Sequence, residues 1–334
     1  MQKMPATTGA RSVHLARVQA TPRVQATTLP RGNGTHRLAD GCHHVFLDVG
    51  ANIGIHTRFL FEPSLYPDAS LSTAIFESQF GSGRDNRDFC AFGFEPNPAH
   101  ADRHRELEAM YGAMGWRYTP VLAAAGNKEG ALTFYHNAKG AGSEEWGFSS
   151  SLHADPKDVI AEEVPVVHLA RWIEREIMGW KLPARVYGKY EGDPGPKVVM
   201  KMDVEGQEYY LLPSLLATGV MCKGVDFVFG EHHARFFRSH QSGTDFDARG
   251  DLDRFDIDKQ AWSWHTAYEK IFGDLKFKKY PKGELVVESE EDAWRIFDLL
   301  VTMMMSTTEE DCKTTFLMAD DESYLHDGAP WPAP

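Results

Sequence analysis

The sequence predicts a doubly wound α/β fold built on a mostly parallel sheet, and three observations support this. From about residue 41, short apolar runs alternate with amphipathic helical patterns, which is the order expected of strands joined by crossover helices. Two of the runs, 45–49 and 198–202, are almost wholly apolar, as strands covered on both faces are. Both are followed by a turn that contains acids and glycine. No internal repeat points to another architecture.

The composition is that of a globular protein. The chain has 334 residues, of which 42% are hydrophobic and 12% aromatic, so disorder throughout is excluded. No apolar run reaches the roughly 18–20 residues needed to span a bilayer, and no signal-peptide core is present at the N-terminus. We expect one domain over residues 41–328, preceded by a basic arm over 1–40 and followed by a tail over 329–334.

The charge of the chain is unevenly distributed. The first 39 residues contain six of the 35 basic residues and no acid, so the remainder is more acidic than the net charge of −13 suggests. Such a body repels a phosphate backbone, which argues against nucleic acid as a partner. The Arg- and Thr-rich arm is either a disordered linker or an organelle-targeting segment, so the expected compartment is cytoplasmic or organellar. The sequence carries no signal for the oligomeric state.

The four cysteines are widely spaced and form no C-x-x-C pair. We therefore expect reduced thiols rather than a disulfide framework or a zinc site. They are Cys42, Cys90, Cys222 and Cys312.

Periodicity and capping signals place the individual elements. Proline inside the apolar pattern of 211–216 predicts a kink or a split at Pro213. The Ser-, Gly- and Pro-rich stretch 62–88 is expected to be a loop, and Asn97 with Pro98 is expected to start a helix. The expected strands are 45–49, 92–95, 118–124, 131–135, 164–169, 198–202, 225–229 and 314–318, and the expected helices cover 55–61, the segment after Asn97, the segment around 172–177, 211–216 and the segment after Ser289.

The first chemical signal is the turn Asp48-Val-Gly50-Ala-Asn52-Ile-Gly54. Glycines where a strand meets a helix let backbone N–H groups approach a ligand closely. The spacing is G-x-x-x-G rather than G-x-G-x-x-G, and a phosphate-binding lysine is missing. A ligand with its own positive charge is therefore favoured over a diphosphate, and Asp48 is placed to face an amino group or a sulfonium.

The second signal is Glu95, which ends the second strand of the predicted sheet. In nucleotide-type sites an acid at this place accepts hydrogen bonds from the ribose hydroxyls. The glycine turn and Glu95 together predict a cofactor that contains adenosine.

Three motifs in this order, DVGANIG, FEPNP and KMDVEG, resemble those of the FkbM-type family of S-adenosylmethionine-dependent methyltransferases. The resemblance spans roughly residues 43–325. It implies the class I methyltransferase fold, with a seven-stranded sheet whose last strand is antiparallel, and S-adenosyl-L-methionine as cofactor. The resemblance also implies site residues: Asp48, Gly50, Asn52 and Gly54 at the methionine end of the cofactor, with Glu95 at the ribose and Asn97 beside it.

The chain departs from the family pattern in two places. The usual Leu-Asp before the middle helix is Leu169-Ala170, and the insertions at about 62–88 and 234–260 exceed the minimal domain.

Polar residues at the ends of later strands are candidates for the chemistry of transfer. Asp203 ends the strand 198–202, and Glu231, His232 and His233 end the next one, at the edge where open α/β sheets bind ligands. We expect Asp203 or His232 to act as the base, with Glu205 and Glu231 positioning the acceptor. A divalent metal held by Asp203, Glu231 and His232 is an open alternative.

These observations predict a methyltransferase that acts on a hydroxyl of a glycan or a small molecule. Two other classes stay open: a nicotinamide-dependent oxidoreductase, which the missing third glycine disfavours, and a binding protein that keeps the fold without turnover.

Overall fold

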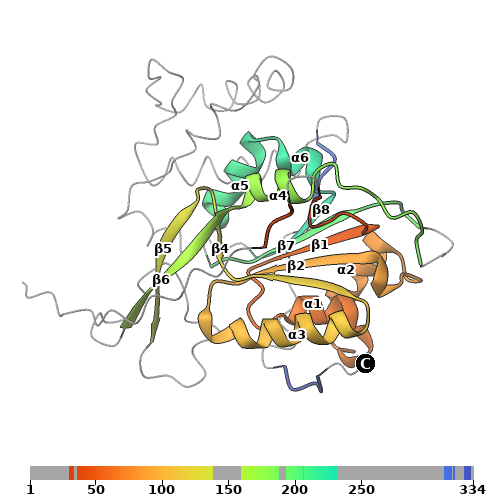
Figure 1. Ribbon diagram of the computed structural model, residues 1–334, viewed down its shortest axis with the longest axis horizontal. Helices are drawn as coiled ribbons and strands as arrows, with labels where there is room; N and C mark the ends of the chain where they lie inside the picture. Colours follow the sequence, from red (N-terminus) through yellow and green to blue (C-terminus); the bar gives the residue numbers. More distant parts are fainter. Residues whose placement is uncertain are drawn as a thin grey trace, which may run out of the picture.

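A central sheet separates two layers of helices in the computed structural model (Figure 1). The structure describes residues 30–33, 36–137, 159–187, 193–205, 207–231, 312–317, 319 and 327–331. The predicted arm lies mostly outside these residues, as do His232, the helix expected after Ser289 and most of the tail. In the part of the chain that is described, no helix combines the length and the apolar character needed to cross a membrane.

The main sheet has six strands in the order β3-β2-β1-β7-β8-β9, and all of its neighbouring strands run parallel. The predicted fold class is confirmed. Within the described residues, however, the sheet has six strands rather than seven, and β9 pairs parallel with β8 instead of forming an antiparallel edge. The strands are β1 (His44–Val49), β2 (Phe89–Phe94), β3 (Arg117–Val121), β7 (Val198–Met202), β8 (Phe227–Gly230) and β9 (Thr315–Leu317).

The order reverses beside β1, because the chain first builds outward through β2 and β3 and then returns to add β7 on the other side. Ligands of open α/β sheets bind at such a switch point, outside the carboxyl ends of the strands. The end of β1 is therefore the place to look for a site.

A smaller three-stranded sheet extends from the main body and is seen at the left of Figure 1. Its strands are β4 (Ala124–Gly126), β5 (Gly130–Asn137) and β6 (Val159–His168). β6 pairs antiparallel with β5 and parallel with β4, which follows β3 directly along the chain.

The helices cover both faces of the main sheet (Figure 1). One face carries α4 (Leu169–Glu176), α5 (Glu208–Ala217) and α6 (Val220–Gly224), and the other carries α1 (Ile55–Phe61), α2 (Ser70–Phe80) and α3 (Ala101–Ala113). Short 3-10 turns at η1 (Pro63–Leu65), η2 (Asn86–Asp88) and η3 (Pro98–His100) complete the described elements.

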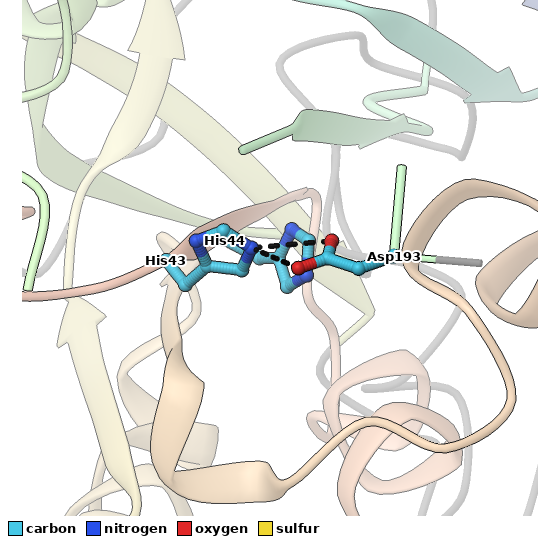
Figure 2. Close-up of side chains that lie close together, drawn as sticks. All are labelled: His43, His44 and Asp193. Carbon is cyan, nitrogen blue, oxygen red and sulfur yellow. Dashed lines mark hydrogen bonds and ion pairs between the residues drawn. The ribbon is translucent and has the colours of Figure 1, made fainter. Parts of the chain in front are cut away.

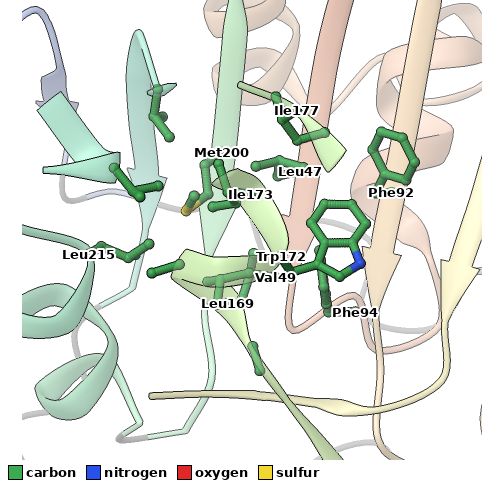
Figure 3. Close-up of a cluster of buried hydrophobic side chains, with 14 of the residues drawn as sticks. Leu47, Val49, Phe92, Phe94, Leu169, Trp172, Ile173, Ile177, Met200 and Leu215 are labelled. Carbon is green, nitrogen blue, oxygen red and sulfur yellow. The ribbon is translucent and has the colours of Figure 1, made fainter. Parts of the chain in front are cut away.

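Successive side chains of β1 point to opposite faces of the sheet and pack into two separate hydrophobic cores. Val45, Leu47 and Val49 pack under α4 and α5, whereas Phe46 packs under α1 and α2. Trp172 of α4 anchors the first core, with its ring edge-on to Phe92 at 5.1 Å and to Phe94 at 4.9 Å between centroids (Figure 3). Burial on both faces explains why these strands read as continuous apolar runs.

The prediction of a loop over 62–88 is wrong, because this stretch contains α2. Turn-forming residues at its two ends hid a buried stripe between them. Ile75, Phe76 and Phe80 are all buried, and they tie the helix to the core beneath α1. The predicted cap is found at the 3-10 turn η3, where the Asn97 side chain accepts a hydrogen bond from the Ala99 N–H at 3.0 Å, and α3 follows from Ala101. The predicted split at Pro213 is not seen, because α5 runs through this position.

The prediction of reduced thiols is also wrong, because the structure contains two disulfides, Cys42–Cys90 and Cys222–Cys312. The partners are 48 and 90 residues apart in the sequence. In each case the fold joins them. Cys42 precedes β1 and Cys90 lies on the neighbouring β2, while Cys222 lies in α6 and Cys312 shortly before β9. Spacing along the chain carries no signal of such pairing.

Candidate active site

The carboxyl ends of four neighbouring strands are tied together by backbone hydrogen bonds. The Gly50 N–H donates to Phe94 O at 3.1 Å, and the Asp203 N–H donates to Val49 O at 2.9 Å. The Glu231 N–H in turn donates to Met202 O at 3.1 Å. The polar residues that follow β2, β1, β7 and β8 therefore form one continuous row along this edge of the sheet.

Gly50, which follows β1, packs directly against the backbone of Asp203, which follows β7. Its φ is +82°, and a Cβ atom there would lie 1.7 Å from the backbone oxygen of Asp203. Only glycine satisfies both the left-handed conformation and the close approach. Asn52, two residues on, also has a positive φ of 48°, which is uncommon for a residue with a side chain.

Glu95 holds this turn in place. Its Oε2 accepts a hydrogen bond from the Asn52 N–H at 2.7 Å, and its Oε1 accepts one from the Asn97 N–H at 2.8 Å. His100 Nδ1 lies 3.6 Å from Oε1. Each carboxylate oxygen has two lone pairs, so the side chain can accept further hydrogen bonds from a ligand.

Helix α3 fixes the same turn from behind. His104 Nε2 lies 2.8 Å from Asn52 O, and its Nδ1 lies 2.6 Å from the Tyr118 hydroxyl. Burial lowers the pKa of His104 to about 4, so the ring is neutral at physiological pH, with Nε2–H donating to Asn52 O and the Tyr118 hydroxyl donating to Nδ1. Next to it, Arg103 Nε donates to Ile53 O at 2.7 Å. Consecutive residues of α3 thus bind consecutive carbonyls of the turn.

The C-terminal segment reinforces this support. The side chain of Asp327 has no exposed surface, and it binds Arg58, Arg103 at 2.6 Å and Tyr66 at 3.0 Å. Trp331 lies over the guanidinium groups of Arg58 and Arg103 at 5.9 and 4.9 Å. Because Arg103 also donates to Ile53 O, residues 327–331 are linked to the glycine turn through the half-buried Arg103 side chain.

Asp203 is paired with a buried lysine. Lys201 is 2% exposed, and its Nζ lies 2.9 Å from Asp203 Oδ2 and 3.0 Å from Gly50 O. The ammonium neutralises the carboxylate and at the same time bridges β7 to the glycine turn. Glu205 follows with a φ of +53°, and the Glu208 side chain accepts a hydrogen bond from the Val204 N–H at 2.8 Å. Strain of this kind in a non-glycine residue is typical of functional turns.

A pocket lies along this edge, over the ends of β1, β2 and β7. It brings together six of the predicted site residues. They are Gly50, Asn52, Glu95, Asn97, Asp203 and Glu205.

The other predicted residues do not line the pocket. Asp48 is fully buried and accepts a hydrogen bond from the Thr57 hydroxyl at 3.1 Å. Gly54 has a φ of +79° and precedes α1, where an added Cβ would lie 3.0 Å from Leu107. Glu231 stands at the end of β8, outside the pocket wall. His232 lies outside the described residues.

Sequence reasoning missed several residues of the site. Lys201 was detectable, because it lies two residues before Asp203 and side chains two apart in a strand share a face. Phe134, Ala124 and Ala125 reach the pocket from the smaller sheet, whose position no local pattern predicts. His100 lies in the turn η3, between the predicted Asn97 and helix α3.

Comparison with known families agrees with this geometry. A family model described as the methyltransferase FkbM domain matches residues 48–249, which is more than half of the chain. The match begins at Asp48, ahead of the glycine turn, and includes Glu95, Asp203 and Glu231. No curated protein and no solved structure gives a significant match. On the family match and the arrangement of this edge, the chain belongs to the FkbM methyltransferase domain family.

Proposed function

We propose that this protein transfers a methyl group from S-adenosyl-L-methionine to a hydroxyl group of a glycan or a small molecule. The observation that carries the proposal is the convergence of Glu95, the glycine turn and Asp203 on one pocket at the switch point of the sheet. Family membership favours methyl transfer over the nicotinamide-dependent alternative.

The residues at the ends of β1 and β2 fit such a cofactor. Glu95 is 6% exposed and faces the pocket with its carboxylate already oriented by two backbone N–H groups. A carboxylate fixed in this way is suited to accept hydrogen bonds from the two ribose hydroxyls. Gly50 lines the pocket, and its lack of a Cβ lets the turn lie directly against the Asp203 carbonyl, so that both segments border the same pocket.

The far wall of the pocket suits a purine ring. Phe134 of β5 and the small residues Ala124 and Ala125 of β4 are buried and line the pocket together with Pro96 and His100. An apolar wall with few polar groups is typical of sites for the base of a nucleoside. In this arrangement the adenine end points toward the smaller sheet, and the reactive end points toward Asp203.

S-adenosyl-L-methionine supplies an electrophilic methyl group on a sulfonium, and in the transfer the methyl–sulfur bond breaks as a methyl–oxygen bond forms. The acceptor hydroxyl has to lose its proton, and Asp203 is our candidate for the base, as it lies in the pocket wall beside Gly50. Lys201 orients this carboxylate through the contact of its ammonium to Oδ2. His232 stays a predicted alternative for the same role.

Carboxylates at the ends of β7 and β8 support a hydroxyl-rich acceptor. Asp203 and Glu205 line the pocket, and Glu231 continues the row on the neighbouring strand. Ionised carboxylates accept hydrogen bonds from hydroxyl donors, whereas they repel phosphates. We therefore place a neutral sugar-like or small-molecule acceptor over β7 and β8, and we do not expect nucleic acid there.

Binding of the cofactor can be tested without knowledge of the acceptor. Isothermal titration with S-adenosyl-L-methionine should show one site, and Glu95→Gln should weaken it by about 10- to 100-fold, since hydrogen bonds to charged groups contribute about 1.5–3 kcal/mol. Glu106→Gln, an exposed position on α3, is the matched control and should bind like wild type. Equal affinities of the Glu95 and Glu106 variants would place the cofactor elsewhere.

Turnover requires an acceptor panel. Incubation with glycans and hydroxylated metabolites should yield a product heavier by one methylene group together with S-adenosylhomocysteine. Asp203→Asn should keep cofactor binding but lower the rate by about 10²–10⁴-fold, the range typical of general-base catalysis. If the variant turns over at the wild-type rate, Asp203 is not the base.

A further inference from the structure

The opposite edge of the sheet carries a second cluster of ligating side chains, shown in Figure 2. It consists of His43, His44 and Asp193, whose nitrogen and oxygen atoms all lie within 4.8 Å of one another. His44 is the first residue of β1, and Asp193 precedes β7, the strand paired with β1. The six residues of β1 place this cluster ~20 Å from the glycine turn, at ~3.3 Å per residue.

From this cluster we infer that the protein holds a divalent transition metal ion, of which Zn²⁺ is the best fit, between His43, His44 and Asp193. The site is independent of the cofactor pocket. Two imidazoles, one carboxylate and an open fourth position form a donor set that Zn²⁺ accepts readily.

The geometry is close to what such an ion needs. Zn–N and Zn–O bonds of about 2.0–2.2 Å in a tetrahedron set ligand atoms ~3.4 Å apart. His43 Nε2 lies 3.0 Å from Asp193 Oδ2 and 3.2 Å from Oδ1, so this edge of the tetrahedron is already short enough (Figure 2). An ion would take the place of the proton now shared by these two side chains. Only the distances from the His44 nitrogen to the other two ligand atoms, which are at most 4.8 Å, have to shorten.

Burial prepares both histidines as ligands. His44 has no exposed surface, and its ring packs against Phe80 and Phe89 at 5.0 and 5.1 Å between centroids and against His43 at 4.4 Å. These ring contacts fix the orientation of the His44 imidazole beside His43. The side chain of Asp193 is 29% exposed, which leaves one side of the cluster open to solvent for entry of the ion.

The carboxylate is oriented by its own loop. Asp193 Oδ1 accepts a hydrogen bond from the Gly195 N–H at 2.8 Å, two residues further along the chain. The carboxylate is thus directed at His43. An outer partner of this kind is typical of metal ligands.

The surroundings exclude the hard cations. The positively charged side chains of Lys197 and Arg84 lie near His44. Ca²⁺ and Mg²⁺ depend on several oxygen ligands, and this cluster offers a single carboxylate beside those two cations. A metal must therefore bind here by direct coordination to nitrogen, which favours Zn²⁺.

The ion would have a structural role. β1 and β7 are hydrogen-bonded neighbours, and their other ends carry Gly50 and Asp203. A metal at the amino edge would fasten the segment before β7 to the start of β1. The disulfide Cys42–Cys90 fastens β1 to β2 at the same edge. The amino edge is then cross-linked on both sides of β1, and the carboxyl edge is left for the ligand.

The test uses the full chain without an affinity tag, stripped by a chelator that is then removed, and ZnCl₂ as the probe. Calorimetric titration of the wild type should show a tight site that Asp193→Asn and His43→Gln each weaken by about 100-fold or more, since the loss of even an outer-shell partner costs about 10–100-fold. His36→Gln is the matched control, because His36 forms an exposed pair with Asp40 at 3.7 Å, and it should keep the site.

A second readout separates binding from folding. In the presence of chelator, Asp193→Asn should melt within a few degrees of the wild type, because its side chain lies in an exposed loop. Added Zn²⁺ should raise the melting temperature of the wild type and of His36→Gln, but not that of the Asp193 variant. Co²⁺ bound to the wild type should give the intense visible absorption of a four-coordinate site. Equal Zn²⁺ affinity of the wild type and the Asp193 and His43 variants, or no tight site in the wild type, would overturn the inference.

Discussion

Substitution of Gly50 by alanine tests whether the close approach of β1 and the residues after β7 builds the site. The added Cβ would lie 1.7 Å from Asp203 O and 2.8 Å from its carbonyl carbon. Since ordinary contacts of this kind exceed 3 Å, the two segments must separate by more than an ångström. That shift breaks the 2.9 Å hydrogen bond from the Asp203 N–H to Val49 O.

The cost follows from three contributions. The left-handed conformation costs about 1–2 kcal/mol for a residue with a Cβ. The lost backbone hydrogen bond costs about 0.5–1.5 kcal/mol, and overpacking adds about 1–3 kcal/mol. Gly50→Ala should therefore lower the free energy of unfolding by roughly 3–6 kcal/mol.

Gly115→Ala is the matched control, because Gly115 also has a positive φ of 76° but nothing lies within 4 Å of the position its Cβ would take. It carries the conformational cost alone. The difference between the two variants, about 2–4 kcal/mol, corresponds to roughly 5–15 °C in melting temperature at about 2–4 °C per kcal/mol. Differential scanning fluorimetry measures this difference, and calorimetry should show that only Gly50→Ala abolishes S-adenosyl-L-methionine binding. Similar melting temperatures and intact binding in both variants would refute the reasoning.

Protonation of His104 should weaken the fold in acid. The unfolded chain takes up a proton at this residue below about pH 6.5, but burial lowers the pKa of the folded chain's His104 to about 4. The free energy of unfolding should therefore fall by ~1.4 kcal/mol per pH unit between these two values. His104→Gln should flatten the slope of urea-unfolding free energy against pH by that amount, and an unchanged slope would contradict the assignment. Asp327→Asn removes the carboxylate that binds Arg58 and Arg103, while Arg58 keeps Glu62 at 2.9 Å, so it should cost about 1.5–3 kcal/mol in urea unfolding, whereas the exposed Asp102→Asn should stay within about 0.5 kcal/mol of wild type. Alkylation of the native protein should label no cysteine, and labelling before reduction would disprove the disulfides. Reduction should lower the free energy of unfolding by about 4 kcal/mol per bridge, because the bridges close loops of 48 and 90 residues.

The fold class could be predicted from the sequence, because strands that are buried on both faces appear as continuous apolar runs. β1 and β7 are apolar along nearly their whole length, and the structure places strands at these two runs. Helix α2 was missed for the opposite reason. Its buried residues are embedded in a stretch rich in Ser, Gly and Pro, and composition outweighed periodicity in the prediction.

Prediction of the site succeeded where the ligand-facing residues directly follow a strand. Gly50, Glu95 and Asp203 follow β1, β2 and β7, and parallel strands deliver their carboxyl ends to one edge. The contributions of Phe134 and Asp327 were not predictable, because they depend on a separate sheet and on a segment more than 200 residues away in the sequence from Arg103.

The disulfides were not predictable for the same reason, because their cysteines are far apart in the sequence and become neighbours only in the folded chain. Disulfides persist mainly in oxidising compartments, which weighs against the cytoplasmic alternative drawn from the sequence.

The pairing of Lys201 with Asp203 connects the architecture to the proposed chemistry. A buried lysine is costly unless it is paired, and here its ammonium binds both the carboxylate and Gly50 O. One side chain therefore sets the position of the proposed base relative to the turn that faces the cofactor. Misplacement of reacting groups by about an ångström can lower a rate by about 100-fold. Lys201 is thus expected to act through position as well as charge, because the loss of its ammonium frees the two strand ends to move apart.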